Sequence, residues 1–330
     1  MRAAVFGTGS WGTAFTMVLT DAGTDVVMWG YESEVCDLIN RTHENPIYHP
    51  GIKLAETVHA THDAARALDG AELVVFAVPA QTLRSNLMQW QGLVPSDAVL
   101  VSLMKGIELN TAKRMTEVIR EVLGTPAEQL VAVSGPNLAR EIAERQPAAT
   151  VVACVDEDVA VRVQKACHTP RFRPYTNTDV IGAELGGAVK NVIALATGIA
   201  DGLGFGENAK AAVITRGLAE TARLGAAMGA VPTTFMGLAG LGDLVATCMS
   251  PLSRNRTFGE RMGRGETVAE IAASTRQVAE GVKSCESVLE LARRGDVEMP
   301  IVEHVVQVVR GDLTPIDMLT SLLGRDVRAE

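Results

Sequence analysis

Two lysines lie in stretches of sequence that are otherwise apolar, where a charged side chain is unusual. Lys105 follows an apolar run in "SLMKGIE", and Lys190 lies in "GAVKNVIALATGIADGLG", where nearly every other residue is small or apolar. A lysine shielded from water loses proton affinity and can exchange protons near neutral pH. Such a group suits hydride chemistry at a carbonyl carbon, whose oxygen gains or loses a proton. Spacing alone also fits two other interpretations: Lys190 as a helix-edge lysine whose stem covers apolar surface, and Lys105 as a solvated charge at a strand end.

The helix expected around Lys190 separates it from the next residue. Gly186, Lys190 and Ala194 share one face, whereas Asn191 points about 100° away. The small residues before Lys190 leave room around its side chain. In "VSGPNLARE", which follows a strand candidate, Asn137 is a candidate N-cap, and the N–H groups of this turn could face a ligand.

A third cluster lies in "GLAGLGDLVATCMSPLSRNRTFG". Asp243 and Thr247 point the same way if this segment is helical. Arg254, Asn255 and Arg256 follow a turn, and arginine binds phosphate through two parallel hydrogen bonds. The pair of arginines could be ordinary surface charge. In an acidic protein, a basic cluster beside a glycine-rich apolar loop favours an anionic ligand.

The glycines of "VFGTGSWG" form a GxGxxG pattern, with Gly7, Gly9 and Gly12 between a strand candidate and a helical run. In a dinucleotide site these glycines permit a tight turn, close approach of a pyrophosphate and packing of helix on strand. The helix then presents free N–H groups to the phosphates. An ordinary glycine-rich turn of a doubly wound fold is the alternative.

The second strand candidate ends in "MWGYES". An acidic residue about 20 positions after the glycines binds the adenosine ribose 2′-hydroxyl in NAD sites. Glu32 stands at that distance, although a solvated glutamate at a helix start fits equally well. Tyr31 occupies the place where an arginine would favour the 2′-phosphate of NADP. The cofactor is therefore NAD or NADP, with a lean to NAD.

These residues are distributed over two parts of the chain that differ in their sequence pattern. Short β-branched runs alternate with helical stretches in the first half, which predicts an α/β fold: a Rossmann-type, doubly wound, mainly parallel sheet. Helical periodicity dominates afterwards. We expect a dinucleotide-binding Rossmann domain over 1–180 and an all-helical substrate and catalytic domain over 181–330. The strand candidates are 3–7, 25–30, 57–61, 71–79, 98–106, 129–136, 149–155 and 171–178, and the clearest late helices 182–200, 208–228, 286–295 and 301–311.

Composition narrows the function classes. The formal net charge of −9 argues against a general binder of nucleic acid or anionic membranes. No signal peptide is evident, and no apolar run reaches the ~20 residues that cross a bilayer, so we expect a cytoplasmic protein without stable membrane insertion. The five scattered cysteines fit free thiols, and their spacing with histidine fits no zinc site.

With these stretches in view, the chain resembles the bacterial NAD(P)-dependent glycerol-3-phosphate dehydrogenases. The matching motifs run in order from about residue 5 to about 301 and cover most of the chain. They are "GTGSWGTAF", "ENPIYHPGIKL", "FAVPAQ", "KGIE", "SGPNLARE", "ELGGAVKNVIALATGIADGLGFGENAKAAVITRGLAE", "GLAGLGDLVATC", "SRNRTFG", "EGV" and "VEMPI".

The resemblance implies reversible hydride transfer between NAD(P)H and C2 of dihydroxyacetone phosphate, giving sn-glycerol 3-phosphate for glycerophospholipid synthesis, in a homodimer without a metal. It implies that Lys190 exchanges the proton of the C2 oxygen, with Lys105, Asp243 and Thr247 as catalytic partners. The substrate residues implied are Lys105, Gly135, Asn137, Lys190, Asn191, Asp243, Ser253, Arg254 and Asn255. The cofactor residues are Gly7, Gly9, Ser10, Trp11, Gly12, Tyr31, Glu32, Lys105, Ala139, Arg254, Val278 and Glu280.

The sequence departs from the family pattern at one place, varies with the family at another, and leaves two alternative functions open. The family often has arginine near the position of Tyr31, and a serine or threonine is also seen at the position of Asn137. A related 3-hydroxy acid dehydrogenase would share both domains and a lysine–asparagine pair, but it gives no reason for "SRNR". A dinucleotide-binding regulator without catalysis would need no lysine in a helix of small residues.

Overall fold

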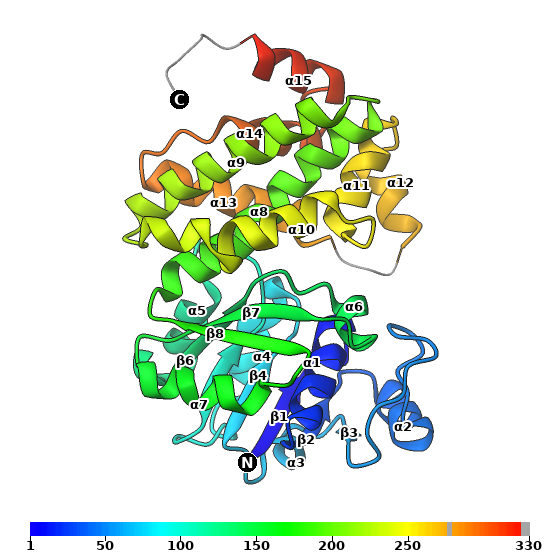
Figure 1. Ribbon diagram of the computed structural model, residues 1–330, viewed down its shortest axis with the longest axis vertical. Helices are drawn as coiled ribbons and strands as arrows, with labels where there is room; N and C mark the ends of the chain where they lie inside the picture. Colours follow the sequence, from blue (N-terminus) through cyan, green and yellow to red (C-terminus); the bar gives the residue numbers. More distant parts are fainter. Residues whose placement is uncertain (276–278, 325–330) are drawn as a thin grey trace.

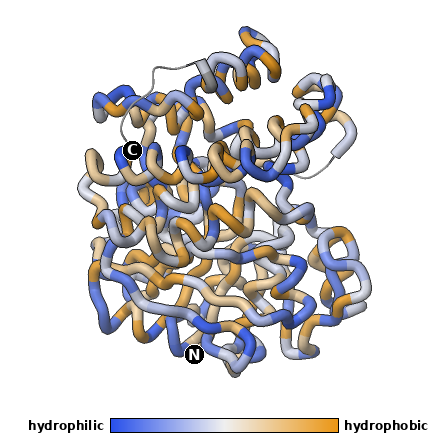
Figure 2. The backbone as a smooth tube through the Cα atoms, turned by 45° about the horizontal axis from the view of Figure 1, so that its top comes forward, coloured by the Kyte–Doolittle hydropathy of each residue, from blue (hydrophilic) through white to orange (hydrophobic). Residues whose placement is uncertain are grey.

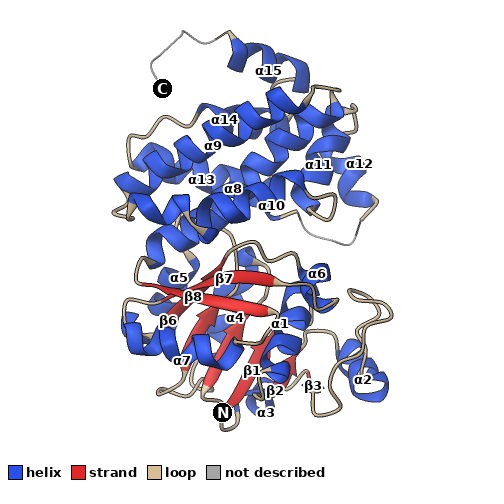
Figure 3. Cartoon of the chain, viewed as in Figure 1, coloured by secondary structure: helices blue, strands red, loops and turns tan. Residues whose placement is uncertain are grey.

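The chain folds into an α/β part followed by a purely helical part (Figures 1 and 3). This computed structural model describes residues 1–275 and 279–324. Figure 3 shows the strands gathered in the first part and helices stacked beyond them. The last strand ends at Asn177 and the first long helix begins at Val180.

One eight-stranded sheet forms the first part, in the order β3-β2-β1-β4-β5-β6-β7-β8. Neighbouring strands are parallel except for β6 and β7, which are antiparallel. Each predicted strand is present, so the mainly parallel sheet is confirmed. The strands are β1 (Arg2–Phe6), β2 (Asp25–Trp29), β3 (His59–Thr61), β4 (Leu73–Phe76), β5 (Val99–Ser102), β6 (Leu130–Ser134), β7 (Ala148–Ala153) and β8 (Phe172–Asn177).

Helices cover both faces of this sheet. Successive residues of a strand face opposite sides, and in β1 Val5 joins one hydrophobic core while Phe6 joins the other. The first core includes residues of α1 (Ser10–Asp21), α2 (Ser33–Thr42), α6 (Ala139–Ala143) and α7 (Glu157–Cys167). The second includes residues of η1 (Ala80–Thr82), α3 (Ala64–Leu68), α4 (Leu83–Trp90) and α5 (Met115–Leu123). The short η2 (Ala127–Gln129) precedes β6.

The helical part is built around α8 (Val180–Gly202), whose residues are almost all buried. Glycines let α11 (Arg254–Gly263) approach it backbone to backbone: a Cβ at Gly198 would lie 2.0 Å from the Arg256 carbonyl oxygen, and one at Gly259 would lie 2.1 Å from that of Leu195. The other elements are α9 (Glu207–Ala227), η3 (Pro232–Met236), η4 (Leu238–Gly242), α10 (Asp243–Met249), α12 (Val268–Ala273), α13 (Glu280–Arg294), α14 (Pro300–Arg310) and α15 (Pro315–Leu323).

Helix α8 corrects one expectation from the sequence. It is long and apolar enough to span a membrane by length and composition, although no such run was expected. In the fold, 94% of its most apolar window is buried inside the protein, and apolar segments run through the interior of both parts in Figure 2. Its composition therefore matches a central core helix. All five cysteines are buried free thiols.

Candidate active site

The glycine turn between β1 and α1 has the geometry of an anion-binding turn. Gly7 has φ +128°, and a Cβ there would lie 2.6 Å from the Ala77 carbonyl oxygen, so only glycine fits. A Cβ at Gly12 would lie 2.1 Å from the Gly7 carbonyl oxygen. A Cβ at Gly9 would face open space. Gly9 is the N-cap residue of α1, so no side chain caps the helix there, and its first turn contains no acidic residue. Room and free N–H groups therefore coincide where a pyrophosphate would bind.

The remaining cofactor candidates are arranged around this turn. Tyr31 follows β2 and is 86% exposed, and Glu32 is the exposed N-cap residue of α2 without a side-chain cap bond. The Trp11 ring lies 5.5 Å from that of Phe15, and its buried Nε1 has no hydrogen-bond partner. Ala139 begins α6, whose residues pack beside α1. Val278 lies outside the described residues.

Lys105 and Lys190 meet at one carboxylate, that of Asp243. Lys190 Nζ donates to Asp243 Oδ1 at 2.7 Å and to Thr247 Oγ1 at 2.5 Å. Lys105 Nζ donates to Asp243 Oδ2 at 2.5 Å and to the Gly135 carbonyl oxygen at 2.8 Å. Asp243 and Thr247 lie one turn apart on α10, so the condition under which the two side chains point the same way is met.

Burial decides between the two interpretations of Lys190. The residue is 7% exposed and Asp243 is 1% exposed, so Lys190 is not a helix-edge lysine extending to solvent. The small residues before it serve its neighbours. A Cβ at Gly187 would lie 3.3 Å from Lys105 Cγ, and one at Gly186 would lie 2.3 Å from the Ala239 carbonyl oxygen.

The cluster has two ammonium groups for one carboxylate, and this imbalance perturbs both kinds of group. Burial lowers the pKa of Lys105 to about 8, with the attraction of Asp243 opposing the shift and the repulsion of Lys190 adding to it. Burial alone would raise the pKa of Asp243, but the charges of Lys105 and Lys190 outweigh it, so the pKa falls below its ordinary value. Asp243 therefore stays ionised and acts as the counter-ion of the two lysines. It is not a protonated carboxylic acid that could donate a proton.

A chain of amides extends from the lysines to α11 and α13. Asn191 Nδ2 donates to the Lys105 carbonyl oxygen at 3.1 Å, and its Oδ1 accepts from Asn255 Nδ2 at 2.9 Å. Asn255 Oδ1 in turn accepts from the Gly281 N–H at 2.9 Å. Asn191 and Asn255 therefore fix the position of α11 relative to Lys105.

The "SRNR" stretch divides into structural and free groups. Ser253 Oγ caps α11 by accepting from the Arg256 N–H. Arg256 is committed to ion pairs with Asp201 and Glu260. Arg254 is exposed and has no hydrogen bond or ion pair to the residues that the structure describes. Of the two arginines, Arg254 is the one available to an anion.

Glu280 carries the opposite charge next to Arg254. Burial raises the pKa of Glu280, and the Arg254 charge opposes that shift. Its Oε2 is buried near Gly106 in the loop that carries Lys105, and it has no hydrogen-bond partner within residues 1–275 and 279–324. An unpaired buried acceptor of this kind suits contact with hydroxyl or amide donors of a ligand.

Asn137 is not the N-cap of α6, contrary to the sequence prediction; Leu138 is. Its side chain is held elsewhere, because Nδ2 donates to Thr150 Oγ1 at 2.9 Å, and Thr150 Oγ1 donates to the Ser134 carbonyl oxygen at 3.1 Å. Asn137 Oδ1 is buried and has no hydrogen-bond partner among the described residues. Thr150 was not selected from the sequence, since nothing in its strand marks it apart from the core.

Asn45 and His49 are further residues that sequence reasoning missed. Both are 1% exposed and both contact the glycine turn: Asn45 Nδ2 lies 2.7 Å from the Thr8 carbonyl oxygen, and His49 Nε2 lies 2.8 Å from that of Ser10. They belong to "ENPIYHPGIKL". That motif was a signal of resemblance, but its polar residues had no assigned role.

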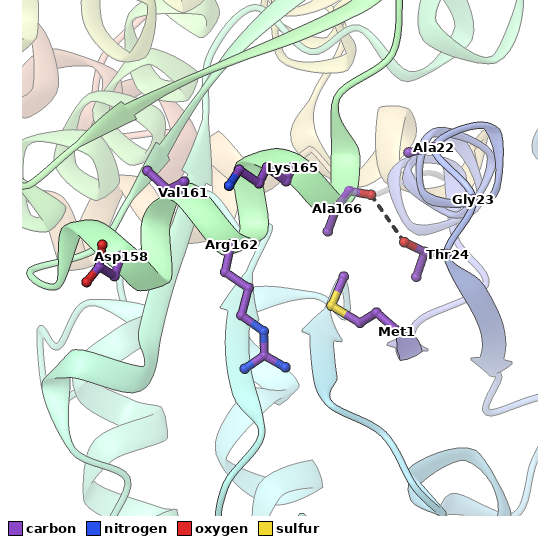
Figure 4. Close-up of a pocket in the computed structure, with 9 residues that line it drawn as sticks. All are labelled: Met1, Ala22, Gly23, Thr24, Asp158, Val161, Arg162, Lys165 and Ala166. Atoms are coloured by element: carbon purple, nitrogen blue, oxygen red, sulfur yellow. Dashed lines mark hydrogen bonds between the residues drawn. The ribbon is translucent and has the colours of Figure 1, made fainter.

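A separate hollow of about 470 Å³ lies far from this chemistry. Figure 4 shows Met1 and Thr24 facing Arg162 and Lys165 of α7, with the Thr24 hydroxyl bonded to the Ala166 carbonyl oxygen. Met1 and Thr24 lie just before the amino ends of β1 and β2. The glycine turn and Lys105, by contrast, follow the carboxyl ends of their strands. Ligands of such sheets bind at the carboxyl ends of the strands, so the hollow is on the opposite edge from the expected site. Its Arg162 is already paired with Glu72.

Comparison with known proteins finds family models that match both parts of the chain. Residues 2–160 match the model of the NAD-dependent glycerol-3-phosphate dehydrogenase N-terminus, and residues 179–320 match that of its C-terminus. The chain belongs to the NAD-dependent glycerol-3-phosphate dehydrogenase family.

Individual members of the family are similar over their whole length. The glycerol-3-phosphate dehydrogenase [NAD(P)+] of Streptomyces griseus is 62% identical over 100% of this chain and 98% of its own. That of Corynebacterium glutamicum is 55% identical over 99% and 98%. The solved glycerol-3-phosphate dehydrogenase of Coxiella burnetii superposes with a TM-score of 0.94 at 37% identity, covering 98% of this chain and 99% of that one.

A more distant structure shares the fold alone. A D-mandelate dehydrogenase complex with NADH has a TM-score of 0.64 at 12% identity, covering 98% of this chain and 100% of that one. The two-domain dehydrogenase architecture is therefore wider than the family, and it carries no argument about the substrate.

Proposed function

We propose that this chain catalyses reversible hydride transfer between NAD(P)H and C2 of dihydroxyacetone phosphate, giving sn-glycerol 3-phosphate. The observation that carries the proposal is the buried cluster of Lys105, Lys190 and Asp243 at the carboxyl edge of the sheet that bears the glycine turn. The names of the relatives support the substrate. The related 3-hydroxy acid chemistry has no use for the free Arg254.

Lys190 is the proposed proton donor to the C2 oxygen. When bound, the dinucleotide supplies the hydride that forms the new C2–H bond. The π electron pair of the carbonyl moves to oxygen, which takes a proton from the Lys190 ammonium, and solvent later restores that proton. In the reverse direction neutral Lys190 accepts the hydroxyl proton as the hydride leaves. Thr247 and Asp243 hold Nζ in place through the bonds of 2.5 and 2.7 Å.

Lys105 and Asp243 set the electrostatics of this step. The cluster has one more positive than negative charge, which stabilises negative charge developing on the substrate oxygen. Little water screens this interaction, because Lys190 and Asp243 are buried. Lys105 is also tied to Gly135, so substrate contacts at Gly135 and Asn137 are proposed next to it.

Arg254 is the proposed ligand of the substrate phosphate, with Asn255 beside it. Because Arg254 has no hydrogen bond or ion pair among the described residues, no existing contact has to be broken for a phosphate to bind. Asn191 and Asn255 place the start of α11 relative to Lys105. Binding of the remote phosphate then holds the reacting carbon near the lysines.

Purified protein should oxidise NADH or NADPH on addition of dihydroxyacetone phosphate, followed by absorbance at 340 nm. A 3-hydroxy acid such as 3-hydroxybutyrate, tested with NAD or NADP in the oxidative direction, is the matched comparison. Turnover with the phosphate ester alone supports the proposal. Turnover with the hydroxy acid alone would replace it, and binding of either cofactor without any turnover would favour the non-catalytic regulator.

The rate of dihydroxyacetone phosphate reduction should fall as pH rises above about 8. The pKa of Lys105 is lowered to about 8, so the side chain is charged below that pH and neutral above it. Loss of its charge removes stabilisation of the developing oxyanion. In Lys105→Arg the guanidinium stays charged throughout, and the falling limb of a kcat/KM profile should move to higher pH. A limb at the same pH in both proteins would assign it to another group.

We also propose a preference for NAD, on the strength of Glu32 and the lack of an arginine at Tyr31. The double change Tyr31→Arg and Glu32→Ser should raise the ratio of kcat/KM for NADPH over NADH by about tenfold or more, since an arginine–phosphate bond contributes roughly 1.5–3 kcal/mol. Glu34→Ser, an exposed change in the same helical turn, is the control. An unchanged ratio in the double variant would place the discrimination elsewhere.

The wider setting follows the family. We propose that the enzyme works as a cytoplasmic homodimer and that its product supplies the glycerophospholipid backbone. We further propose that residues 1–180 form the dinucleotide domain and 181–330 the substrate domain. The domain proposal is supported by the end of the last strand at Asn177 and the start of α8 at Val180.

A further inference from the structure

The segment between α2 and β3 carries two buried polar side chains that the mechanism above does not use. Asn45 and His49 are each 1% exposed. Both lie against the main chain of the glycine turn, more than thirty residues away in sequence. Polar groups buried this fully need hydrogen-bond partners, and here the partners are the carbonyl oxygens of Thr8 and Ser10 together with the hydroxyls of Ser10 and Thr13 at the start of α1.

The direction of each bond is set by chemistry. A carbonyl oxygen can only accept, so His49 Nε2 donates to the Ser10 carbonyl oxygen at 2.8 Å. His49 Nδ1 is buried and has no partner in the part of the chain that the structure describes, so the ring is neutral with its proton on Nε2. Burial lowers the pKa of His49, in keeping with that state. Asn45 Nδ2 likewise donates to the Thr8 carbonyl oxygen at 2.7 Å and to Thr13 Oγ1 at 2.9 Å.

An anion-binding turn requires this arrangement. Its N–H groups attract phosphate, but a carbonyl oxygen turned to the same side would repel it. Asn45 bonds the Thr8 carbonyl oxygen of the turn, and His49 bonds that of Ser10, the first residue of α1, so the two side chains tie the turn and the start of the helix from within the protein. The turn is thereby kept with its N–H groups free for the ligand.

The segment itself is ordered by local bonds. Glu44 Oε1 accepts from the Gly51 N–H at 2.7 Å, and the Glu44 carboxylate pairs with Lys53 at 3.2 Å. The His49 N–H donates to the Asn45 carbonyl oxygen at 2.8 Å. Asn45 and His49 are therefore presented to the glycine turn by a loop that its own hydrogen bonds and ion pair close.

We propose that Asn45 and His49 are positioning residues for the pyrophosphate of the dinucleotide, acting through the carbonyls of Thr8 and Ser10. The proposal rests on the assignment of the glycine turn to a dinucleotide. It requires neither residue to touch the substrate. Loss of either donor should weaken dinucleotide binding and leave the chemical step and substrate affinity nearly unchanged.

The test measures binding of NADH and of ADP-ribose to the full chain by isothermal titration calorimetry. His49→Leu and Asn45→Ser should each raise Kd about tenfold for both ligands. Each change removes one hydrogen bond that orders the binding turn, and the free energy of one such bond corresponds to about a tenfold change in Kd. His49→Gln keeps an N–H donor at a similar place and should stay within about threefold of wild type. His304→Leu is the matched control, because His304 contacts the Pro300 carbonyl oxygen in the helical part.

Steady-state kinetics separate the two roles, because a merely structural role would not change KM for NADH without also changing kcat and KM for the substrate. In the two donor-deficient variants KM for NADH should rise, whereas kcat and KM for dihydroxyacetone phosphate should stay within about threefold. Wild-type affinity in both variants would overturn the proposal, as would equal weakening in His49→Gln. If His49→Leu does not fold, judged by circular dichroism, Asn45→Ser and His49→Gln decide the outcome. A wild type that binds NADH without turnover would refute the proposed function and leave this binding comparison intact.

Discussion

Replacing Lys190 with methionine should lower kcat/KM for dihydroxyacetone phosphate by at least about 10²-fold, and up to about 10⁴-fold, because general acid–base catalysis contributes that much. Methionine fills most of the same space, so the core around α8 should remain packed. The variant cannot donate a proton, and it also removes one of the two charges that face Asp243. The loss should fall mainly on kcat, since Lys190 acts on the reacting oxygen rather than on the phosphate.

The measurement is NADH oxidation at 340 nm with saturating cofactor. Lys165→Met on α7 is the control, since Lys165 is exposed and lies at the amino edge of the sheet. Full activity in Lys165→Met with loss in Lys190→Met assigns the effect to the site. If Lys190→Met retained wild-type kcat, Lys190 would be structural, and Lys105 would be the proton donor to test next.

Asp243→Asn should reduce both stability and activity. The change leaves the ammonium groups of Lys105 and Lys190 without their shared counter-ion in a buried site. Removing one partner of a buried ion pair costs on the order of 3–5 kcal/mol. The amide cannot neutralise either lysine, so we also expect kcat to fall by about 10²-fold or more.

The stability loss has a characteristic pH dependence. Without Asp243 the attraction that raises the pKa of Lys105 is absent, so its folded pKa moves further below the unfolded value. The unfolded chain then binds more protons than the folded chain between those two pKa values, and stability rises with pH across that interval. Asp243→Asn should therefore recover part of its lost free energy of unfolding as pH rises from 7 toward 10.

Chemical denaturation at several pH values measures this recovery. Asp21→Asn is the control, because the Asp21–Arg145 pair is exposed and such pairs contribute about 0–1 kcal/mol. Asp243→Asn with wild-type stability at pH 7 would show that the lysines do not depend on this carboxylate. A loss that is constant with pH would show that their protonation is not involved.

Local sequence determined the elements of this protein. The strand candidates are present because runs such as Leu73–Phe76, buried on both faces, are apolar at successive positions. The glycine turn was readable because Gly7 and Gly12 stand where backbone atoms leave no room for a Cβ. The helical periodicity of residues 182–200 and 208–228 predicted the long helices α8 and α9. The sequence patterns that predicted these elements depend on neighbouring residues alone.

Tertiary structure decided which charged group meets which. Spacing could not show that Lys105 and Lys190, on separate elements, share the carboxylate of Asp243. Nor could it show that Arg256 is committed to Asp201 and Glu260 while Arg254 makes no hydrogen bond or ion pair with any described residue, although the two are almost adjacent in sequence. Ion pairs and buried hydrogen bonds join residues that are distant along the chain, and their partners are fixed only when the helices and the sheet pack together.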